Sequence, residues 1–392
     1  MIKIRTLDQL HIPTGARVFY RVDYNVPLDG ARISDATRIE ETLPTLRILR
    51  ERGAAIIIAS HLGRPKGERN AKYSLKPVRE KLAELLETEV QWADDCVGVD
   101  TSNLKPGQLL LLENLRFHAG EEKNDPAFAA QLRELADFYV NDAFGACHRA
   151  HASIEALPRL MPDDHTAGGQ LLARELEFLQ KVTNIEERPF VALMGGAKIA
   201  GKIEPLEVLV KLADKVLIGG GMANTFLAAR GVPMGGSLVD KDSLDVAQRI
   251  LEGHARAEVV LPDDLICADS LDNPTEIEDV EVREGLTAEA KAFDIGPRTI
   301  AKYEAVLKEA KLIFWNGPMG VFEKEQFAKG TMAMAAAVAA ADAVTVVGGG
   351  ESVEAIKASG FADRITHIST GGGASLEFIS GAALPGVEVL RS

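Results

Sequence analysis

Short apolar runs alternate with stretches of helical periodicity along the whole chain, and this alternation most constrains the fold. The runs cover residues 18–22, 54–59, 109–112, 138–140, 190–194, 215–218, 258–261, 312–315, 343–347 and 364–368. Such runs are typical of parallel strands covered by helices on both faces. Residues 35–52 begin with an acid, have apolar residues at helical spacing and end before Gly53, so we expect a crossover helix there. The pattern predicts an α/β fold.

The length of the chain predicts two domains. A chain of 392 residues exceeds what one hydrophobic core usually covers, so we expect domains of roughly 170–200 residues each. Paired glycines in residues 165–170, followed by an amphipathic stretch over 171–182, permit the backbone change that a hinge needs. We therefore expect the division near residue 170.

Charge and cysteine content limit the class of protein. The net charge of −14 and the pI near 5.2 argue against a nucleic-acid or anionic-membrane partner, because both surfaces repel an acidic protein. Cys96, Cys147 and Cys267 are odd in number and widely spaced, which predicts packed thiols in a reducing compartment. The N-terminus has no apolar signal region, and the longest apolar run stops at Asp342. We expect a soluble cytoplasmic protein.

The two halves differ in the residues that follow their strands. Glycine pairs or triplets follow strands of the second half, at residues 195–196, 219–221, 348–350 and 371–373. The first half instead has charged, amide and imidazole side chains: Asp23, Asn25, His61, Arg64, Arg116, His118, His148, Arg149 and His151. Ligands of open parallel sheets bind beyond the carboxyl ends of the strands. Bare glycines favour a nucleotide, and converging cations favour a small anion with several charges.

The segment GGAKIAGKI, residues 195–203, contains G-x-x-x-x-G-K followed by Ile203, where a phosphate-binding P-loop has Ser or Thr. Ile203 cannot hold Mg²⁺, so one interpretation is a damaged P-loop. The other is a helix beginning near Ala197, with Lys198 and Lys202 on one face toward a polyanion. Two solvated lysines on a surface helix remain the simplest alternative.

The segment WNGPMGVFE, residues 315–323, is more specific. It ends a strand with Asn316, fixes a tight loop with two glycines and a proline, and closes with Glu323, which could accept hydrogen bonds from a ribose. Glu351 follows a glycine triplet and offers a hard carboxylate for a metal ion. It could equally be an acid favoured by a helix N-terminus.

The segments RVDYNVP, SHLGRP, LLENLRFH, FGACHRAHAS, GGAKIAGKI, GGGMANTF, WNGPMGVFE and STGGGASLEF, in this order over essentially the whole chain, closely resemble phosphoglycerate kinases. The resemblance implies two Rossmann-like three-layer αβα domains with parallel sheets that face each other across a cleft. Residues 1–170 would bind 3-phosphoglycerate and residues 171–379 would bind Mg-ADP or Mg-ATP. Residues 380–392 would return to pack on the first domain.

The resemblance also implies roles for individual residues. The 3-phosphoglycerate site would comprise Asp23, Asn25, Arg38, His61, Leu62, Gly63, Arg64, Arg116 and Arg149. The nucleotide site would comprise Lys198, Lys202, Gly219, Gly220, Asn316, Glu323, Gly349, Gly350, Glu351 and Ser352. Gly371, Gly372 and Gly373 would meet the transferred phosphate, Arg38 and Lys202 would be catalytic, and Glu351 would hold Mg²⁺. The P-loop likeness is then coincidental. The family commonly has Asp after the glycine triplet, where this chain has Glu351.

The activity implied is reversible transfer of the acyl phosphate of 1,3-bisphosphoglycerate to ADP in glycolysis and gluconeogenesis, by a monomer that closes about a hinge. Another small-acid kinase or P-loop NTPase is disfavoured by Ile203, and a nicotinamide dehydrogenase by the lack of G-x-G-x-x-G after the first strand. A non-catalytic two-domain binding protein would not need Arg38 and Lys202 together.

Overall fold

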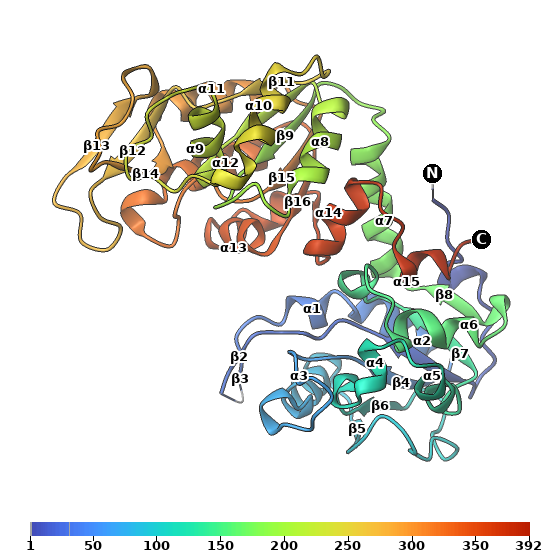
Figure 1. Ribbon diagram of the computed structural model, residues 1–392. Helices are drawn as coiled ribbons and strands as arrows, with labels where there is room; N and C mark the ends of the chain where they lie inside the picture. The colour runs from blue at the N-terminus through green and yellow to red at the C-terminus, as the bar shows by residue number, and fades with distance from the viewer. Residues whose placement is uncertain (1, 31) are drawn as a thin grey trace. The chain divides into compact units, whose positions relative to one another are not determined.

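The computed structural model describes residues 2–30 and 32–392. The chain forms two compact units (Figure 1). The N-terminal unit extends to Glu177 and includes Ala383–Ser392, and the C-terminal unit is Phe178–Ala382. The division falls inside helix α7 (Gln170–Thr183), within the amphipathic stretch that follows the paired glycines.

The N-terminal unit contains a six-stranded parallel sheet in the order β5-β6-β4-β1-β7-β8. Its strands are β1 (Arg17–Arg21), β4 (Ala55–Ala59), β5 (Val90–Ala93), β6 (Leu109–Leu112), β7 (Phe138–Asn141) and β8 (Thr166–Gly168). A hairpin of β2 (Leu28–Asp29) and β3 (Arg32–Ile33) lies outside this sheet. The four predicted strands of this half are confirmed. The edge strands β5 and β8 were not predicted, because β5 is only partly buried and β8 has three residues.

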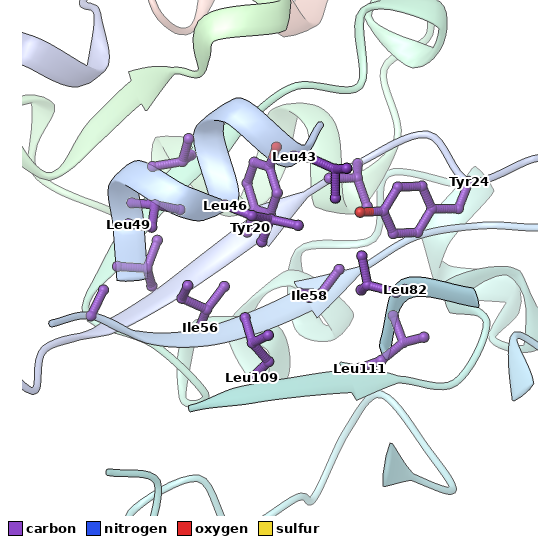
Figure 2. Close-up of a cluster of buried hydrophobic side chains, with 14 of the residues drawn as sticks. Tyr20, Tyr24, Leu43, Leu46, Leu49, Ile56, Ile58, Leu82, Leu109 and Leu111 are labelled. Carbon is purple, nitrogen blue, oxygen red and sulfur yellow. The ribbon is translucent and has the colours of Figure 1, made fainter. Parts of the chain in front are cut away.

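Both faces of this sheet are buried, which explains why its strands have continuous apolar runs rather than alternating ones. On one face Tyr20, Ile56, Ile58, Leu109 and Leu111 pack with Leu43, Leu46, Leu49 and Leu82 from the helices (Figure 2). On the opposite face Phe19, Ile57, Leu110 and Tyr139 are buried too. The unit is therefore a helix–sheet–helix sandwich.

The helices of the N-terminal unit are α1 (Thr37–Glu40), α2 (Leu43–Glu51), α3 (Lys76–Leu86), α4 (Ala119–Glu122), α5 (Pro126–Arg133), α6 (Leu157–Arg159) and α15 (Pro385–Glu388). The prediction of one crossover helix over residues 35–52 is wrong, because the segment is divided between α1 and α2. Pro44 lacks the N–H that a continuous helix would need and its ring would clash with the preceding turn. The Thr42 hydroxyl instead donates to the carbonyl of Ile39, 2.7 Å away.

The C-terminal unit contains a second six-stranded parallel sheet in the order β11-β10-β9-β15-β16-β17. Its strands are β9 (Phe190–Met194), β10 (Lys215–Ile218), β11 (Glu258–Val260), β15 (Leu312–Asn316), β16 (Val344–Gly348) and β17 (His367–Ile368). All six predicted strands are present, although the last is shorter than residues 364–368. Two mostly parallel sheets, each in its own unit, confirm the predicted α/β class.

Helices connect and cover the strands of the C-terminal unit. They are α8 (Ile203–Leu212), α9 (Gly220–Ala229), α10 (Leu244–Glu252), α11 (Pro297–Glu309), α12 (Lys329–Ala340), α13 (Gly350–Ala358) and α14 (Gly373–Ile379). On one face of the sheet, Trp315 and Val347 pack with Tyr303 of α11 and Met334 of α12. The buried Tyr303 hydroxyl donates toward the carbonyls of Ile218 and Val260, 2.7 and 3.0 Å away.

A three-stranded antiparallel sheet in the C-terminal unit was not predicted. It consists of β12 (Asp264–Ala268) between β13 (Ile277–Glu281) and β14 (Lys291–Ile295). The outer strand β13 is largely exposed and contains three acids, so it has no apolar run to detect. This sheet supplies Phe293 and Asp294 to the wall of a pocket described below.

The last ten residues pack on the N-terminal unit. The Arg5 N–H donates to the carbonyl of Leu390, and the Gly386 N–H donates to that of Cys147. Leu384, Val387 and Leu390 are buried. The three cysteines are buried and unpaired, as predicted. Among the described residues, no helix is both long and apolar enough to cross a membrane.

Candidate functional site

Polar side chains follow four neighbouring strands of the N-terminal sheet. Arg116 follows β6, His61 follows β4, Asp23 follows β1, and Arg149 comes in the loop after β7. Parallel strands end at the same edge of a sheet, so the strand order brings residues distant in the sequence to one edge. The structure thus groups these residues as the sequence pattern predicts.

Asp23 lies at the centre of this group. Its carboxylate pairs with the Arg38 guanidinium, accepts from the Asn25 N–H at 3.1 Å, and lies 3.8 Å from Nε2 of His61. Burial by itself raises the pKa of Asp23, but Arg38 and His61 outweigh burial and the pKa falls to about 2. Asp23 is therefore a permanent anion that holds Arg38 and faces His61.

The loop after His61 is braced by hydrogen bonds. The Gly63 N–H donates to Oδ1 of Asn25 at 2.9 Å, the Gly63 carbonyl accepts from Arg116 at 2.8 Å, and the Leu62 carbonyl accepts from Asn114 at 2.8 Å. Gly63 has φ near +63°, and a Cβ there would come within 2.3 Å of the Tyr73 ring. Only glycine fits this close approach. Arg64, the next residue, is exposed.

Positive charge at this edge exceeds its immediate compensation. Arg116 is 6% exposed, and its Nε has no hydrogen-bond partner among the described residues. Burial lowers the pKa of Arg116, and Arg21 and Arg149 lower it further, against the attraction of Glu122. Burial, followed by Arg116, Arg21 and Arg149, lowers the pKa of His151 to about 3. The three arginines repel one another and would gain most from a bound anion.

In the C-terminal unit, four helices begin soon after strands of the parallel sheet. Helix α9 begins at Gly220 after β10, α13 at Gly350 after β16, and α14 at Gly373 after β17. Helix α8 begins at Ile203, after the loop that follows β9. Helix N-termini present free N–H groups and partial positive charge, which suits phosphates.

The segment after β9 differs from its prediction. The helix does not begin near Ala197, so Lys198 and Lys202 do not share a helix face. Gly201 has φ near +81°, which a right-handed helix cannot accommodate, and Lys202 is the N-cap residue of α8. Lys198 is exposed, whereas Lys202 is partly buried and donates to the Gly195 carbonyl at 2.9 Å. Burial lowers the pKa of Lys202, and nearby Glu351 opposes that shift.

A cavity of about 660 Å³ opens beside these turns. Its lining includes Gly196, Gly220, Leu238, Phe293, Pro318, Met319, Glu323 and Glu351. Gly220 has φ near +62°, and a Cβ there would lie 2.8 Å from the Gly196 carbonyl oxygen. Apolar walls with a few polar groups at the rim are typical of small-molecule sites.

The loop after β15 is tied to the loop after β16. The Asn316 side chain donates to the carbonyl of Gly348 at 2.9 Å, and the Gly317 N–H donates to the Ser352 hydroxyl. Gly349 has φ near +92° and lies against Asn316, where a Cβ would come within 2.7 Å of the amide. The two loops are therefore fixed to each other by Asn316, Gly349 and Ser352, and the exposed Glu351 lies next to Ser352 in the chain.

Some buried residues that support the N-terminal site were not predicted from the sequence. Arg21 is fully buried at the end of β1, and Glu121 and Ser153 are fully buried beside it. An arginine inside an apolar strand is almost never buried without a partner, and this was the available signal. Phe293 and Asp294 were missed because the strand that carries them was not predicted.

The N-terminal unit contains a cluster of three potential metal ligands. Asp95, Cys96 and His118 place one ligand atom each within 4.8 Å of one another. Oδ1 of Asp95 is 2.6 Å from Nε2 of His118 and accepts from the Cys96 N–H at 2.7 Å. These hydrogen bonds explain why the three side chains lie together without a metal ion. They also fix the orientation of the His118 ring, two residues after Arg116 in the chain.

Comparison with known proteins gives one consistent result. The family model described as phosphoglycerate kinase matches residues 7–382. The phosphoglycerate kinase of Koribacter versatilis is 50% identical over 390 residues, covering 96% of each chain, and that of Moorella thermoacetica is 50% identical over 394 residues, covering 98% of each.

Solved structures agree with these matches. The structure of phosphoglycerate kinase from Coxiella burnetii has a TM-score of 0.90 and 37% identity, with 99% of both chains covered. The phosphoglycerate kinase structure from Pyrococcus horikoshii has a TM-score of 0.86 and 33% identity, covering 99% of this chain and 98% of the other. With matches of this length and identity, the chain belongs to the phosphoglycerate kinase family.

Proposed function

We propose that this chain transfers the acyl phosphate of 1,3-bisphosphoglycerate to ADP, reversibly, giving 3-phosphoglycerate and ATP. Family membership over nearly the whole chain supports this glycolytic kinase activity. The observation that carries the proposal is the cluster of cations around Asp23 and Arg116, with a separate glycine-lined cavity in the other unit.

The N-terminal site takes the phosphoglycerate in this proposal. Arg38, His61, Arg64, Arg116 and Arg149 hold its carboxylate and phosphate, because guanidinium groups donate paired hydrogen bonds to such anions. Asp23 and Asn25 hold Arg38 and the Leu62–Gly63 loop in place. Nε of Arg116 makes no hydrogen bond to the described residues and lies 3.7 Å from the Glu122 carboxylate, so it can donate to such a ligand. This site lies in the N-terminal unit.

The site in the C-terminal unit takes the nucleotide. The base enters the cavity lined by Gly220, next to Gly219, and Glu323 of the same lining accepts from the ribose. The turns after β15 and β16 carry the residues that border the phosphates in this proposal: Asn316, Gly349, Gly350 and Ser352. Lys198 and Lys202 supply positive charge, and Gly371, Gly372 and Gly373 offer N–H groups to the transferred phosphate. The cavity volume and the glycine-bordered helix starts support this assignment.

The residues present fit a magnesium ion bound with the nucleotide. Glu351 is an exposed residue in the first turn of α13 and lines the cavity. It lies close enough to Lys202 to affect the pKa of that lysine. Mg²⁺ prefers carboxylate oxygens, phosphate oxygens and water, so Glu351 would supply the protein ligand. When bound, the ion would neutralise charge on the phosphates.

The transfer needs charge stabilisation more than a base. The phosphoryl group passes in line between two oxygens, with charge on its equatorial oxygens. Arg38 and Lys202 are the cations proposed to stabilise that charge. Arg38 and Lys202 belong to different units, so the proposal includes closure about a hinge during the cycle, which also keeps water from the acyl phosphate.

The proposal includes a monomer in the cytoplasm. Three buried, unpaired cysteines are typical of a reducing compartment. The large apolar side chains that are exposed among the described residues are Leu160, Leu238 and Ile277. These lie far apart in the sequence, and single exposed side chains of this kind need no partner.

The first test is coupled turnover with 3-phosphoglycerate and Mg-ATP for the native protein and for Arg38→Ala. We expect fast turnover that falls by at least about 100-fold in the variant, since a cation that acts in the transition state has been removed. Calorimetric binding of Mg-ADP should be unchanged in Arg38→Ala. Absence of turnover by the native protein would leave a non-catalytic binding protein on the same fold.

A further inference from the structure

Arg21 is a fully buried arginine at the last position of β1, and its contacts define its role. Its Nε donates to the Ser153 hydroxyl at 2.7 Å, and another nitrogen donates to the Val22 carbonyl. The remaining nitrogen, Nη2, lies 3.2 Å from Nδ1 of His61 and 3.8 Å from the Glu121 carboxylate. Arg21 therefore contacts His61, a residue proposed to bind phosphoglycerate.

The Arg21 guanidinium is held in place by contacts on each of its nitrogens. Glu121, which is also fully buried, supplies the compensating charge. Its two oxygens accept from the Ser153 N–H at 2.9 Å and from the Ser153 hydroxyl. A buried ion pair persists only when its remaining donors and acceptors are satisfied, as they are here.

The contact between Arg21 and His61 determines which imidazole nitrogen carries the proton. A guanidinium has N–H donors and no acceptor, and it does not lose its charge in proteins. Nδ1 of His61 must therefore present its lone pair to Arg21, so the proton of the neutral ring is on Nε2. That nitrogen lies 3.8 Å from Oδ1 of Asp23, whose other carboxylate oxygen pairs with Arg38.

His61 also stays neutral in this environment. Burial lowers its pKa well below the ordinary value, Asp23 opposes the shift, and Arg21, Arg116 and Arg38 reinforce it. A neutral ring could carry its proton on either nitrogen, and water alone would not choose strongly between them. The choice is made by Arg21.

We propose that Arg21 is a positioning residue for phosphoglycerate binding, because it holds His61 as the Nε2–H tautomer and so presents a hydrogen-bond donor to the anionic substrate. This inference rests on the proposed function, which supplies the substrate. It assigns Arg21 and Glu121 a role in orienting a ligand-binding group, in addition to their packing. Without Arg21, part of the His61 population would present a lone pair to the anion, which is repulsive.

The direct test is nitrogen-15 NMR of the histidine rings in the full-length protein at pH 7, with His61 assigned from His61→Gln. We expect an unprotonated Nδ1 and a protonated Nε2 for His61 in the native protein. A protonated Nδ1 would overturn the proposal without any variant. This spectrum needs no turnover, so it is independent of whether the proposed activity holds.

The paired variant Arg21→Met/Glu121→Gln removes the two charges together, which a buried site tolerates better than the loss of one partner. We expect a mixed tautomer for His61, a KM for 3-phosphoglycerate raised roughly tenfold, and a KM for Mg-ATP within about twofold of the native value. Arg21→Lys, which also can only donate, should retain the Nε2–H tautomer if the variant folds.

A matched control is Arg17→Met/Asp137→Asn, which removes an arginine–carboxylate pair from the other end of β1. Its His61 tautomer and both KM values should be unchanged. Equal effects of the two pairs, or a native tautomer and native KM in the Arg21→Met/Glu121→Gln protein, would reject the positioning role. If the spectrum agrees but the native protein does not turn over 3-phosphoglycerate, the proposed function fails and the tautomer assignment remains.

Discussion

Asp294 is a buried carboxylate whose proton affects stability. It is 3% exposed and accepts from the N–H groups of Gly330 and Ile295 at 2.7 and 2.9 Å. Burial raises its pKa to about 7, although these hydrogen bonds oppose the rise. In the unfolded chain an aspartate titrates near 3.9. Between about pH 4 and pH 7 the folded state therefore retains a proton that the unfolded state has released.

The sign of this effect gives a prediction. The Asp294 contribution is fully present below about pH 4 and declines by roughly 1.4 kcal/mol per pH unit until about pH 7. Asp294→Asn should lack this decline, so the free energy of unfolding of the native protein minus that of the variant falls as pH rises. Urea unfolding of the C-terminal unit at several pH values measures it. Parallel curves for the two proteins would contradict the raised pKa.

Glu351 is the residue proposed to hold Mg²⁺, and its carboxylate can be tested directly. Glu351→Gln removes the charge proposed to hold Mg²⁺, so the Mg²⁺ concentration for half-maximal turnover should rise about tenfold, the loss of one charged contact. Glu351→Asp moves the carboxylate by about 1.5 Å, one carbon–carbon bond, and should retain activity with a changed Mg²⁺ dependence. Glu354→Gln, also exposed and on the same helix, is the control. An unchanged Mg²⁺ dependence in both Glu351 variants would exclude the metal role.

The beginning of α7 illustrates how a helix is anchored to a sheet. Asp142, just after β7, accepts from the Leu172 N–H at 2.9 Å and from the Tyr20 hydroxyl at 2.6 Å. Gly169 makes room for this carboxylate, since a Cβ there would come within 2.3 Å of its oxygens. The contacts of Asp142 with α7 therefore depend on glycine at position 169. In the sequence, this position is marked only by the pair Gly168-Gly169.

Gly169→Ala should force these groups apart and lower the free energy of unfolding by about 1–3 kcal/mol. The control is Gly350→Ala, where a Cβ would meet nothing within 4 Å and the residue lies in a helix, so stability should be unchanged or slightly higher. Urea unfolding measures both. A Gly169→Ala protein as stable as the native one would show that Asp142 can move without loss.

Elements were predictable where a single periodicity decides them. Leu109–Leu112 and Phe190–Met194 form strands with the predicted bounds because both faces of each sheet are buried. The exposed strand β13 has no such signal. The lysine helix was misplaced because spacing alone cannot tell a helical turn from a loop with a glycine in the left-handed region, as at Gly201.

For the whole molecule, the C-terminal segment links the end of the chain to its beginning. Leu384, Val387 and Leu390 are buried in the N-terminal unit, and each buried side chain of this size contributes up to roughly 1.5–3 kcal/mol. Deletion of residues 383–392 should therefore destabilise the N-terminal unit by several kcal/mol and leave the C-terminal unit nearly unchanged.

The chain has two tryptophans, Trp92 in the N-terminal unit and Trp315 in the C-terminal unit, so each unit has its own fluorescent reporter. Unfolding of the truncated protein should be followed in Trp315→Phe and Trp92→Phe backgrounds. Only the Trp92 transition should move to lower urea. Deletion of Ser392 alone, which is exposed, is the control. An equal shift of both transitions would mean that the units unfold together.

Periodicity and motifs along the chain were enough to predict the α/β class, the two-domain organisation, the central strands and the family. Each depends on local periodicity or on residue types at a fixed spacing, which need no knowledge of distant contacts. Three features could be seen only in the folded chain: the contact of Arg21 with His61, the close approach of Asp142 to Gly169, and the place of Lys202 at the N-cap of a helix. Burial, pKa shifts and tautomers depend on contacts between residues that are distant in the sequence, and the strand order determines which of these residues come together.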